Sequence, residues 1–311
     1  MPDSDAAEAA EPAAPAMDLA TWGLVLLLSL IWGGSFLFGR ITVQEIPPLA
    51  VVFFRVALAA AAIWTWLIFR KGLPKITVWF ATAIIGMAIF NNIIPFSLIF
   101  YGQQEIGSGL ASVVNAMTPI WTVLIANALT SDERLSARKL AGVLAGFAGV
   151  AVLMGGDAWA GLKASAWAQA AVLLATVSYG FAGVYGKRFK GIDPILVAAG
   201  QLAASTVLMG IYMLASGTLA GLAMPSQTVI WSMIGLALPC TAFAYVLFFT
   251  ILSRAGATNV SLVTFLVPVS GVLLGIVFLG ESLSPWHVGG MALIGLGLLI
   301  LDGRLFAARP T

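Results

Sequence analysis

Long apolar stretches succeed one another along the chain, and short polar or Gly/Pro-rich segments separate them. Each stretch has about the 20 residues that a helix needs to cross roughly 30 Å of hydrocarbon. These stretches are too long and too uniformly apolar for the strands of a membrane barrel. The pattern therefore predicts ten transmembrane helices, near residues 20–43, 48–69, 76–101, 107–129, 137–155, 165–187, 194–216, 227–251, 257–279 and 285–303.

Composition supports a membrane protein. The 311 residues are 60% hydrophobic and 9% charged, whereas a soluble domain carries about a quarter charged residues. Such a chain cannot cover a water-exposed surface, so its expected surroundings are the lipid bilayer. Residues 1–17 are acidic and contain no Lys or Arg, unlike a secretory signal peptide. We therefore expect residues 1–18 to form a disordered cytoplasmic tail, followed by a helix that is retained.

The basic residues indicate the orientation. With the amino terminus inside, Arg40 and Lys163 fall on outer loops and Arg55 falls within a helix. All other Lys and Arg residues fall on cytoplasmic segments, as the positive-inside rule requires. Both termini are therefore expected in the cytoplasm. The cytoplasmic basic residues are Arg70, Lys71, Lys75, Arg134, Arg138, Lys139, Lys187, Arg188, Lys190, Arg254, Arg304 and Arg309.

The chain also contains an internal repeat. Residues 107–124 align with 256–273, and Glu133-Arg134-Leu135-Ser136 aligns with Glu281-Ser282-Leu283-Ser284. Each half has five predicted helices, an odd number, so the second half must enter the membrane inverted. Inverted repeats are typical of secondary transporters, whose solute site lies between the halves. We predict an all-α membrane protein with two inverted five-helix repeats, 19–155 and 164–303, around a central cavity, and a cytoplasmic tail at 304–311.

Several motifs in this layout resemble the EamA-type branch of the drug/metabolite transporter superfamily, over residues 19–303. They are Trp32-Gly33-Gly34-Ser35, Phe53-Phe54-Arg55, the paired Pro119 and Pro268, Asp132-Glu133-Arg134-Leu135 and Gly280-Glu281-Ser282-Leu283. The chain is most similar to exporters of amino acids, including the aromatic amino-acid group. The resemblance implies export across a bacterial inner membrane. It also implies that helices one to four and six to nine surround the cavity, with the fifth and tenth helices peripheral.

One cation, Arg55, lies within a predicted helix. Intramembrane charge is costly and usually faces an internal cavity, where this guanidinium would recognise a carboxylate. The alternative is an arginine that extends to the outer interface or braces neighbouring helix carbonyls. The sequence leaves both open.

Prolines inside the predicted helices coincide with polar side chains. A helix-interior proline leaves the carbonyl four residues earlier without its donor. Three such pairs occur, and two of them are equivalent under the repeat; Pro239, which frees Gly235, has no polar partner. We predict flexible hinges at these prolines and cavity positions for the polar residues, although such amides also bond between helices. The pairs are Asn91 with Pro95, Asn115 with Pro119, and Thr264 with Pro268.

Further polar and aromatic residues are predicted near the middle of the membrane. Trp32 and Tyr179 coincide under the repeat and are expected to form cavity walls. Asn92, Gln201 and Tyr245 supply additional hydrogen-bonding groups. A cavity of this kind suits small amphipathic organic solutes.

Several functional classes are disfavoured. The single Cys240 and single His287 leave no disulfide and no metal cluster, and no carboxylate lies well inside a predicted helix. We therefore expect no enzyme, no cofactor and no nucleic-acid partner. A buried titratable relay is also missing, which favours facilitated diffusion over proton coupling. A multidrug efflux antiporter is the alternative and a channel a more remote one. Glycine spacings such as Gly142-x-x-x-Gly146 favour packing within a monomer or weak dimer.

Overall fold

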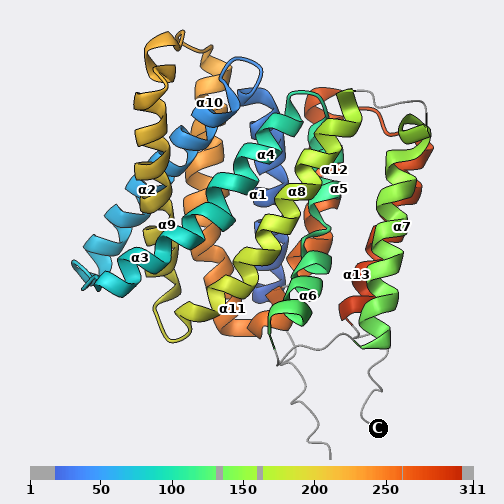
Figure 1. Ribbon diagram of the computed structural model, residues 1–311, viewed down its shortest axis with the longest axis horizontal. Helices are drawn as coiled ribbons and strands as arrows, with labels where there is room; N and C mark the ends of the chain where they lie inside the picture. The colour runs from blue at the N-terminus through green and yellow to red at the C-terminus, as the bar shows by residue number, and fades with distance from the viewer. Residues whose placement is uncertain (1–17, 131–135, 160–163, 261, 303–311) are drawn as a thin grey trace, which may run out of the picture.

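The computed structural model describes residues 18–130, 136–159, 164–260 and 262–302, and over these residues it contains helices and no strands. Long helical rods run side by side between two ends of the molecule (Figure 1). The elements are α1 (Leu19–Thr42), α2 (Pro48–Lys71), α3 (Val78–Met87), η1 (Ala88–Ile93), α4 (Ile94–Gln103), α5 (Ser108–Asn115), α6 (Thr118–Leu129), α7 (Ala137–Trp159), α8 (Ala164–Gly186), η2 (Lys187–Phe189), α9 (Pro194–Ala215), η3 (Thr218–Gly221), α10 (Gln227–Ala237), η4 (Leu238–Phe243), α11 (Ala244–Val260), α12 (Leu262–Leu279) and α13 (Pro285–Asp302).

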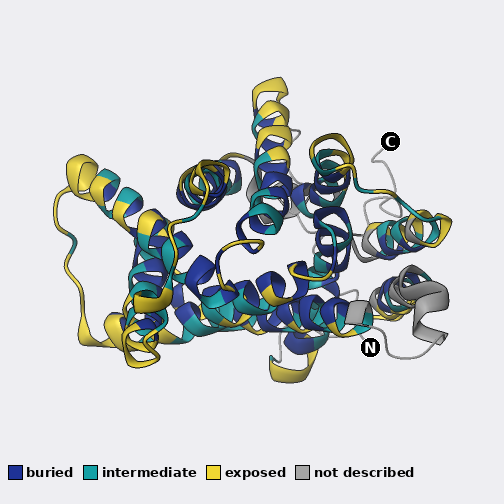
Figure 2. Cartoon of the chain, turned by 90° about the horizontal axis from the view of Figure 1, so that it is seen from above, coloured by how far each residue is buried: buried dark blue, intermediate teal, exposed yellow. Residues whose placement is uncertain are grey.

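Seven helical stretches of the described chain are long and apolar enough to cross a membrane. They are Leu19–Thr42, Pro48–Lys71, Val78–Gln103, Ser108–Leu129, Ala166–Phe189, Pro194–Ala215 and Gln227–Leu252. Shorter apolar helices at Leu140–Gly149, Leu266–Leu279 and Val288–Gly297 lie within the three remaining predicted spans. Large apolar side chains cover the outside of the bundle, where exposed residues gather in Figure 2. The protein is therefore a multi-pass helical membrane protein.

Polar side chains cap the N-terminal ends of several helices, where backbone N–H groups lack partners within the helix. Asp18, Thr77, Asp193 and Ser226 each accept a hydrogen bond from the first turn of the helix that follows. Glu281 does not follow this pattern. The sequence predicts that Glu281 caps the helix after it, but its carboxylate instead accepts from the backbone of α5. That prediction was wrong because the N-terminus of α5, remote in sequence, is packed beside it.

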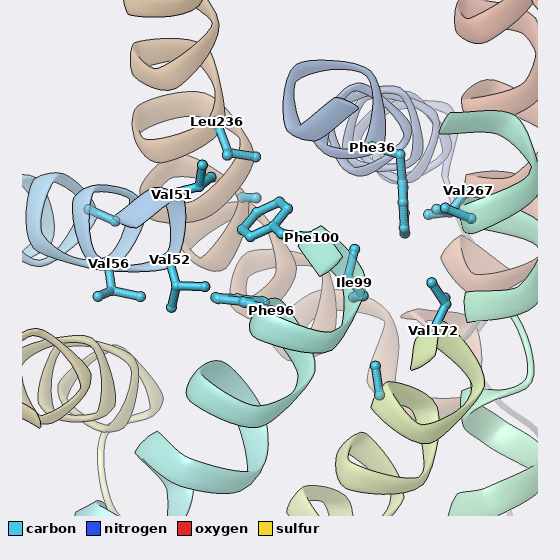
Figure 3. Packing of buried hydrophobic residues seen from close by; sticks show 14 of the residues in the cluster. Phe36, Val51, Val52, Val56, Phe96, Ile99, Phe100, Val172, Leu236 and Val267 are labelled. Carbon is cyan, nitrogen blue, oxygen red and sulfur yellow. The ribbon is translucent and has the colours of Figure 1, made fainter. Parts of the chain in front are cut away.

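Helices of the two halves pack against each other in the centre. α1 packs on α10 and α12, α2 on α9, and α4 on α8. Figure 3 shows the side chains of Phe96 and Phe100 on α4 directed toward α2, where Val51 and Val52 lie. Helices α1 and α12 approach each other closely. A Cβ atom on Gly33 would lie 2.2 Å from Ser270 Oγ and 2.8 Å from the backbone nitrogen of Gly271.

The α7 and α13 pair stands at one side of the bundle (Figure 1). These two helices pack mainly on each other, which agrees with the peripheral place implied for the fifth and tenth spans. Small residues set their spacing, as the glycine pattern predicted. A Cβ on Gly149 would lie 2.6 Å from the nitrogen of Ile294, and one on Gly297 2.7 Å from the oxygen of Gly142. Backbone atoms cannot yield as a flexible side chain can, so the pairing depends on these glycines.

We expect Gly33→Val to destabilise the fold, because its side chain must displace the backbone of α12. Overpacking of this kind costs about 1–3 kcal/mol. Thermal unfolding of the purified protein in detergent would measure the loss. Gly23→Val is the matched control on the same helix, since a Cβ atom on Gly23 would have no neighbouring atom within 4 Å. Equal unfolding temperatures for the two variants would contradict a tight contact between α1 and α12.

Candidate functional site

A cavity of about 690 Å³ lies in the centre of the bundle. Its lining residues come from α1, α2, the α3–α4 and α5–α6 rods, α8, α9, η4 with α11, and α12. No lining residue comes from the described parts of α7 or α13. This is the arrangement implied by the family resemblance, with the first four and the sixth to ninth spans around a cavity.

Most of the residues singled out from the sequence lie on this wall. Three do not, namely Asn92, Pro95 and Pro119. The wall also contains residues that sequence reasoning missed, among them Phe96, Cys240 and Thr241. The predicted residues on the wall are Trp32, Arg55, Asn91, Asn115, Tyr179, Gln201, Tyr245, Thr264 and Pro268.

Arg55 is the charged group of the cavity wall. Only 7% of this residue is exposed, so its side chain does not extend to the outer interface. Its Nε donates a 2.9 Å hydrogen bond to Thr241 Oγ1, and its Cζ lies 3.8 Å from the ring centroid of Phe96. Among the described residues, no carboxylate lies within ion-pair distance and no group accepts a hydrogen bond from the two Nη atoms. The guanidinium therefore keeps donors for a partner in the cavity.

The backbone of η4 orients Thr241. This segment is a π-helix, in which hydrogen bonds span five residues and the turn is wider than in an α-helix. Pro239, its second residue, supplies no N–H group to the helix. Thr241 Oγ1 donates to the carbonyl of Leu236 at 2.8 Å, which leaves the hydroxyl oxygen to accept from Arg55. Thr241 lies two residues after a helix-interior proline, and that spacing was the one sequence signal for this site.

A second π-helix, η1, occupies the corresponding place in the first half. The Ile94 N–H donates to the carbonyl of Ile89, five residues earlier. In this register Pro95 leaves the carbonyl of Phe90 without a donor, and Ser178 on α8 donates to it at 2.8 Å. The sequence predicted instead that the Asn91 carbonyl is freed. The extra residue in the wide turn shifts the freed carbonyl by one position.

The two repeat-related prolines occupy different backbones. Pro119 is the second residue of α6, after a break that ends α5 at Asn115, whereas Pro268 lies inside the continuous α12. The carbonyl of Asn115 accepts a 2.8 Å hydrogen bond from Thr118 Oγ1, so it is already satisfied. The Asn115 side-chain oxygen is different. It is buried at the cavity wall and has no hydrogen-bond partner in the described chain.

The amide groups of η1 divide between the cavity and the packing behind it. Asn91 Nδ2 donates to Gln201 Oε1 at 2.9 Å and to the hydroxyl of Tyr245 at 3.2 Å, and all three residues line the cavity. Asn92 is fully buried and donates to Ser205 Oγ at 3.0 Å. Successive residues of a helix point in different directions around its axis, so the two neighbours face different elements. Asn92 therefore joins η1 to α9. Its Oδ1 also accepts a longer, 3.5 Å bond from the hydroxyl of Tyr245, but Asn92 is not itself part of the cavity wall.

Aromatic rings supply much of the remaining wall. Trp32 lies 5.7 Å from Phe248 between ring centroids, and Tyr245 is stacked on Phe249 at 6.4 Å. Pockets that bind small molecules are mostly apolar, with a few placed polar groups, and have volumes of about 300–1,000 Å³. The central cavity has this character and size.

The protein is thus a multi-pass helical bundle, and an aromatic cavity with a few polar side chains lies between its halves. Membrane carriers are built in this way. The model of the EamA-like transporter family matches residues 21–155 and again residues 166–301. The chain belongs to this family, which is part of the drug/metabolite transporter superfamily.

Known relatives match nearly the whole chain. The inner membrane transporter YedA of Escherichia coli is 30% identical over 94% of both chains. The transporter YoaV of Bacillus subtilis is 26% identical over 89% of this chain and 94% of its own. A protein of Salmonella typhimurium named a probable amino-acid metabolite efflux pump is 28% identical over 89% of this chain and 93% of its own. A solved crystal structure matches with a TM-score of 0.66 and 20% identity, over 94% and 99% of the two chains, which supports the fold.

We expect Asn92→Ala to lower stability, because it removes a buried hydrogen bond between η1 and α9. Such bonds between membrane helices contribute about 0.6–1.7 kcal/mol. Thermal unfolding of Asn92→Ala, Ser205→Ala and the double variant would measure the coupling. The double variant should lose less than the sum of the single losses. Thr82→Ala is the control, since its exposed hydroxyl bonds only within α3. Additive losses would show that the bond between Asn92 and Ser205 contributes nothing.

Proposed function

We propose that the protein is a secondary or facilitative carrier that exports small organic metabolites, and that its solutes are amino acids, including aromatic ones. The observation that carries this proposal is the guanidinium of Arg55 on an aromatic wall, with Nη donors that no described residue uses. Arg binds carboxylates in a bidentate geometry that a neutral solute cannot match. The relative named as an amino-acid metabolite efflux pump supports both the solute class and the direction.

The remaining cavity residues complement an amino acid. Asn115 offers an unpaired acceptor that an ammonium group satisfies, and Asn91, Gln201 and Tyr245 form a polar patch. Trp32, Tyr179 and Thr264 are assigned to the surrounding wall. This assignment involves no metal, no cofactor and no covalent step.

We assign the chain ten transmembrane helices in two inverted five-helix repeats, with both termini in the cytoplasm. Two matches to one family model, and three shorter apolar helices beside seven long ones, support this count. The basic residues of the α8–α9 connection and the inner membrane location of YedA support a cytoplasmic placement for that end. The carrier is proposed to act as a monomer or weak dimer.

Alternating access needs points at which helices bend. Pro95, Pro119 and Pro268 are proposed hinges, and the wide turns of η1 and η4 extend the set. Each proline removes a backbone donor within a rod that borders the cavity, so bending there breaks no helical hydrogen bond.

A multidrug or toxic-metabolite efflux carrier is the second candidate. The observation that favours it is the size of the cavity, about 690 Å³, together with the many aromatic residues that line it. These are Trp32, Phe36, Phe96, Phe100, Tyr179, Tyr245, Phe248 and Phe249. Transport of apolar cations in preference to carboxylates would support this candidate.

The orientation is testable with single introduced cysteines. Met224 is 89% exposed on the η3–α10 connection, and Lys190 is exposed on the α8–α9 connection. We expect an impermeant maleimide to label Met224→Cys in intact cells and Lys190→Cys only after the cells are permeabilised. The native Cys240 is 2% exposed, and the unmodified protein gives its background. Labelling of Lys190→Cys in intact cells would reverse the assigned orientation.

We expect Arg55→Ala to reduce transport of amino acids far more than transport of the corresponding amino-acid amides. A charge-assisted hydrogen bond contributes about 1.5–3 kcal/mol, which is roughly a 10- to 100-fold effect. Uptake into liposomes containing the purified protein measures both solutes. Arg55→Lys keeps the charge without the planar fork and should lose less. Equal losses for acids and amides would assign Arg55 a purely structural role.

A further inference from the structure

The central cavity reaches one end of the bundle and is closed at the other. At the first end its lining includes Gly186, the last residue of α8, and Thr264, the third residue of α12. At the opposite end Phe100, Ile106 and Ser108 are each at most 3% exposed. The closed end holds the α1–α2, α4–α5 and α12–α13 connections, at the top of Figure 1.

A carboxylate from the second half holds the closed end. Glu281 Oε1 accepts a 2.6 Å hydrogen bond from the Ser108 N–H, and its Oε2 accepts a 2.9 Å bond from the Gly109 N–H. These N–H groups open α5, and an anion is favoured at a helix N-terminus. Glu281 itself follows α12 directly, after a turn at Gly280 with a φ of 64°. The contact therefore ties the first half of the protein to the second.

The surroundings are shaped to fit this carboxylate. A Cβ atom on Gly107 would lie 2.7 Å from Glu281 Cδ, and Cβ atoms on Gly109 and Gly275 would lie 3.2 Å and 2.4 Å from Glu281 Oε2. Glycine on both helices is thus what lets the carboxylate enter between them. Gly275 O also accepts from the Glu281 N–H at 3.2 Å, which fixes the backbone of the turn.

Charged groups of one neighbouring element also reach this site. Glu281 lines a second cavity, of about 420 Å³, together with Arg40 and Glu45 from the end of α1 and the connection after it. Arg40 donates to the carbonyls of Gln103 and Gln104. The other residues that contact the carboxylate, on α5 and α12, are uncharged.

Glu45 binds a different helix. Its carboxylate accepts from the backbone and hydroxyl of Ser226, at 2.6 and 2.7 Å. These bonds hold the pKa of Glu45 below its usual value, so mild acid leaves this contact in place.

We infer that Glu281 is the latch of a gate at this end of the cavity, and that the gate opens when its carboxylate leaves the two N–H groups of α5. Both carboxylate oxygens accept in the closed state, so a side chain with a single acceptor oxygen cannot hold both groups. The start of α5 then moves away from the end of α12, and the cavity opens toward the Met224 side. The inference rests on the proposed carrier function, and it names the contact that closes the exit path of the solute.

The test uses Ser35→Cys as the reporter, because Ser35 lines the cavity. An impermeant maleimide is applied from the Met224 side to oriented vesicles. Each variant is compared with the same variant without Ser35→Cys, because the native Cys240 also lines the cavity and its labelling must be subtracted. Adding Glu281→Gln should increase the labelling rate about tenfold or more, since a hydrogen bond to a charged group is lost.

Two matched variants separate the latch from general loosening. Gly107→Ala leaves the charge in place but puts a methyl group 2.7 Å from Glu281 Cδ, so it should open the gate as Glu281→Gln does. Glu105→Gln removes an exposed carboxylate two residues before Gly107 and should leave labelling unchanged.

The inference is overturned if labelling from the Met224 side is unchanged in both Glu281→Gln and Gly107→Ala, or if Glu105→Gln raises it as much as Glu281→Gln does. The assay uses no solute, so it succeeds or fails independently of amino-acid transport. A working gate in a protein that transports no amino acid would overturn the proposed solute and keep the latch.

Discussion

Hydrocarbon offers no hydrogen-bond partner, and this constraint governs every irregular feature of the bundle. The backbone departs from the α-helix at η1, at η4 and between α5 and α6, and all three places border the cavity. In two of them a side-chain hydroxyl replaces the missing donor: Ser178 satisfies the carbonyl of Phe90, and Thr118 satisfies that of Asn115. At η4, the Thr241 hydroxyl donates to the carbonyl of Leu236. Irregular backbone is therefore stable here because a neighbouring helix or the local turn supplies the lost bond.

The same constraint gives Arg55 its significance. A buried cation is destabilising unless its donors are satisfied, and the protein provides one hydroxyl and the face of Phe96. The remaining donors face a cavity. A carboxylate that enters would meet an already positioned guanidinium, and the free energy released would be large because the surroundings are apolar. The unsatisfied donors of Arg55 would then explain both why the empty cavity is destabilising and why it selects anions.

Two kinds of contact hold the halves of the structure. The α1–α12 and α7–α13 contacts depend on glycines that let the partner helix approach closely, so they cannot loosen without creating voids. The contact of Glu281 with α5 is polar, lies beside a second cavity and depends on the charge of one group. The rigid contacts keep α1 with α12 and α7 with α13, whereas a reversible contact at Glu281 would let the start of α5 move relative to α12.

Features that depend on local composition could be predicted from the amino-acid sequence. Apolar length placed the helical stretches, and the repeat and the motif around Arg55 indicated the family, because a residue's preference for hydrocarbon does not depend on its neighbours in space. Nine of the twelve residues singled out lie on the cavity wall. The other features depend on how the helices pack. Asn92 turned away from the cavity toward Ser205, and the wide turn at η1 moved the freed carbonyl to Phe90. Glu281 was expected to cap the next helix, yet the packing of α12 beside α5 presents it with N–H groups more than 170 residues away. Partners so distant along the chain leave no local pattern, since their meeting is set by how whole helices pack.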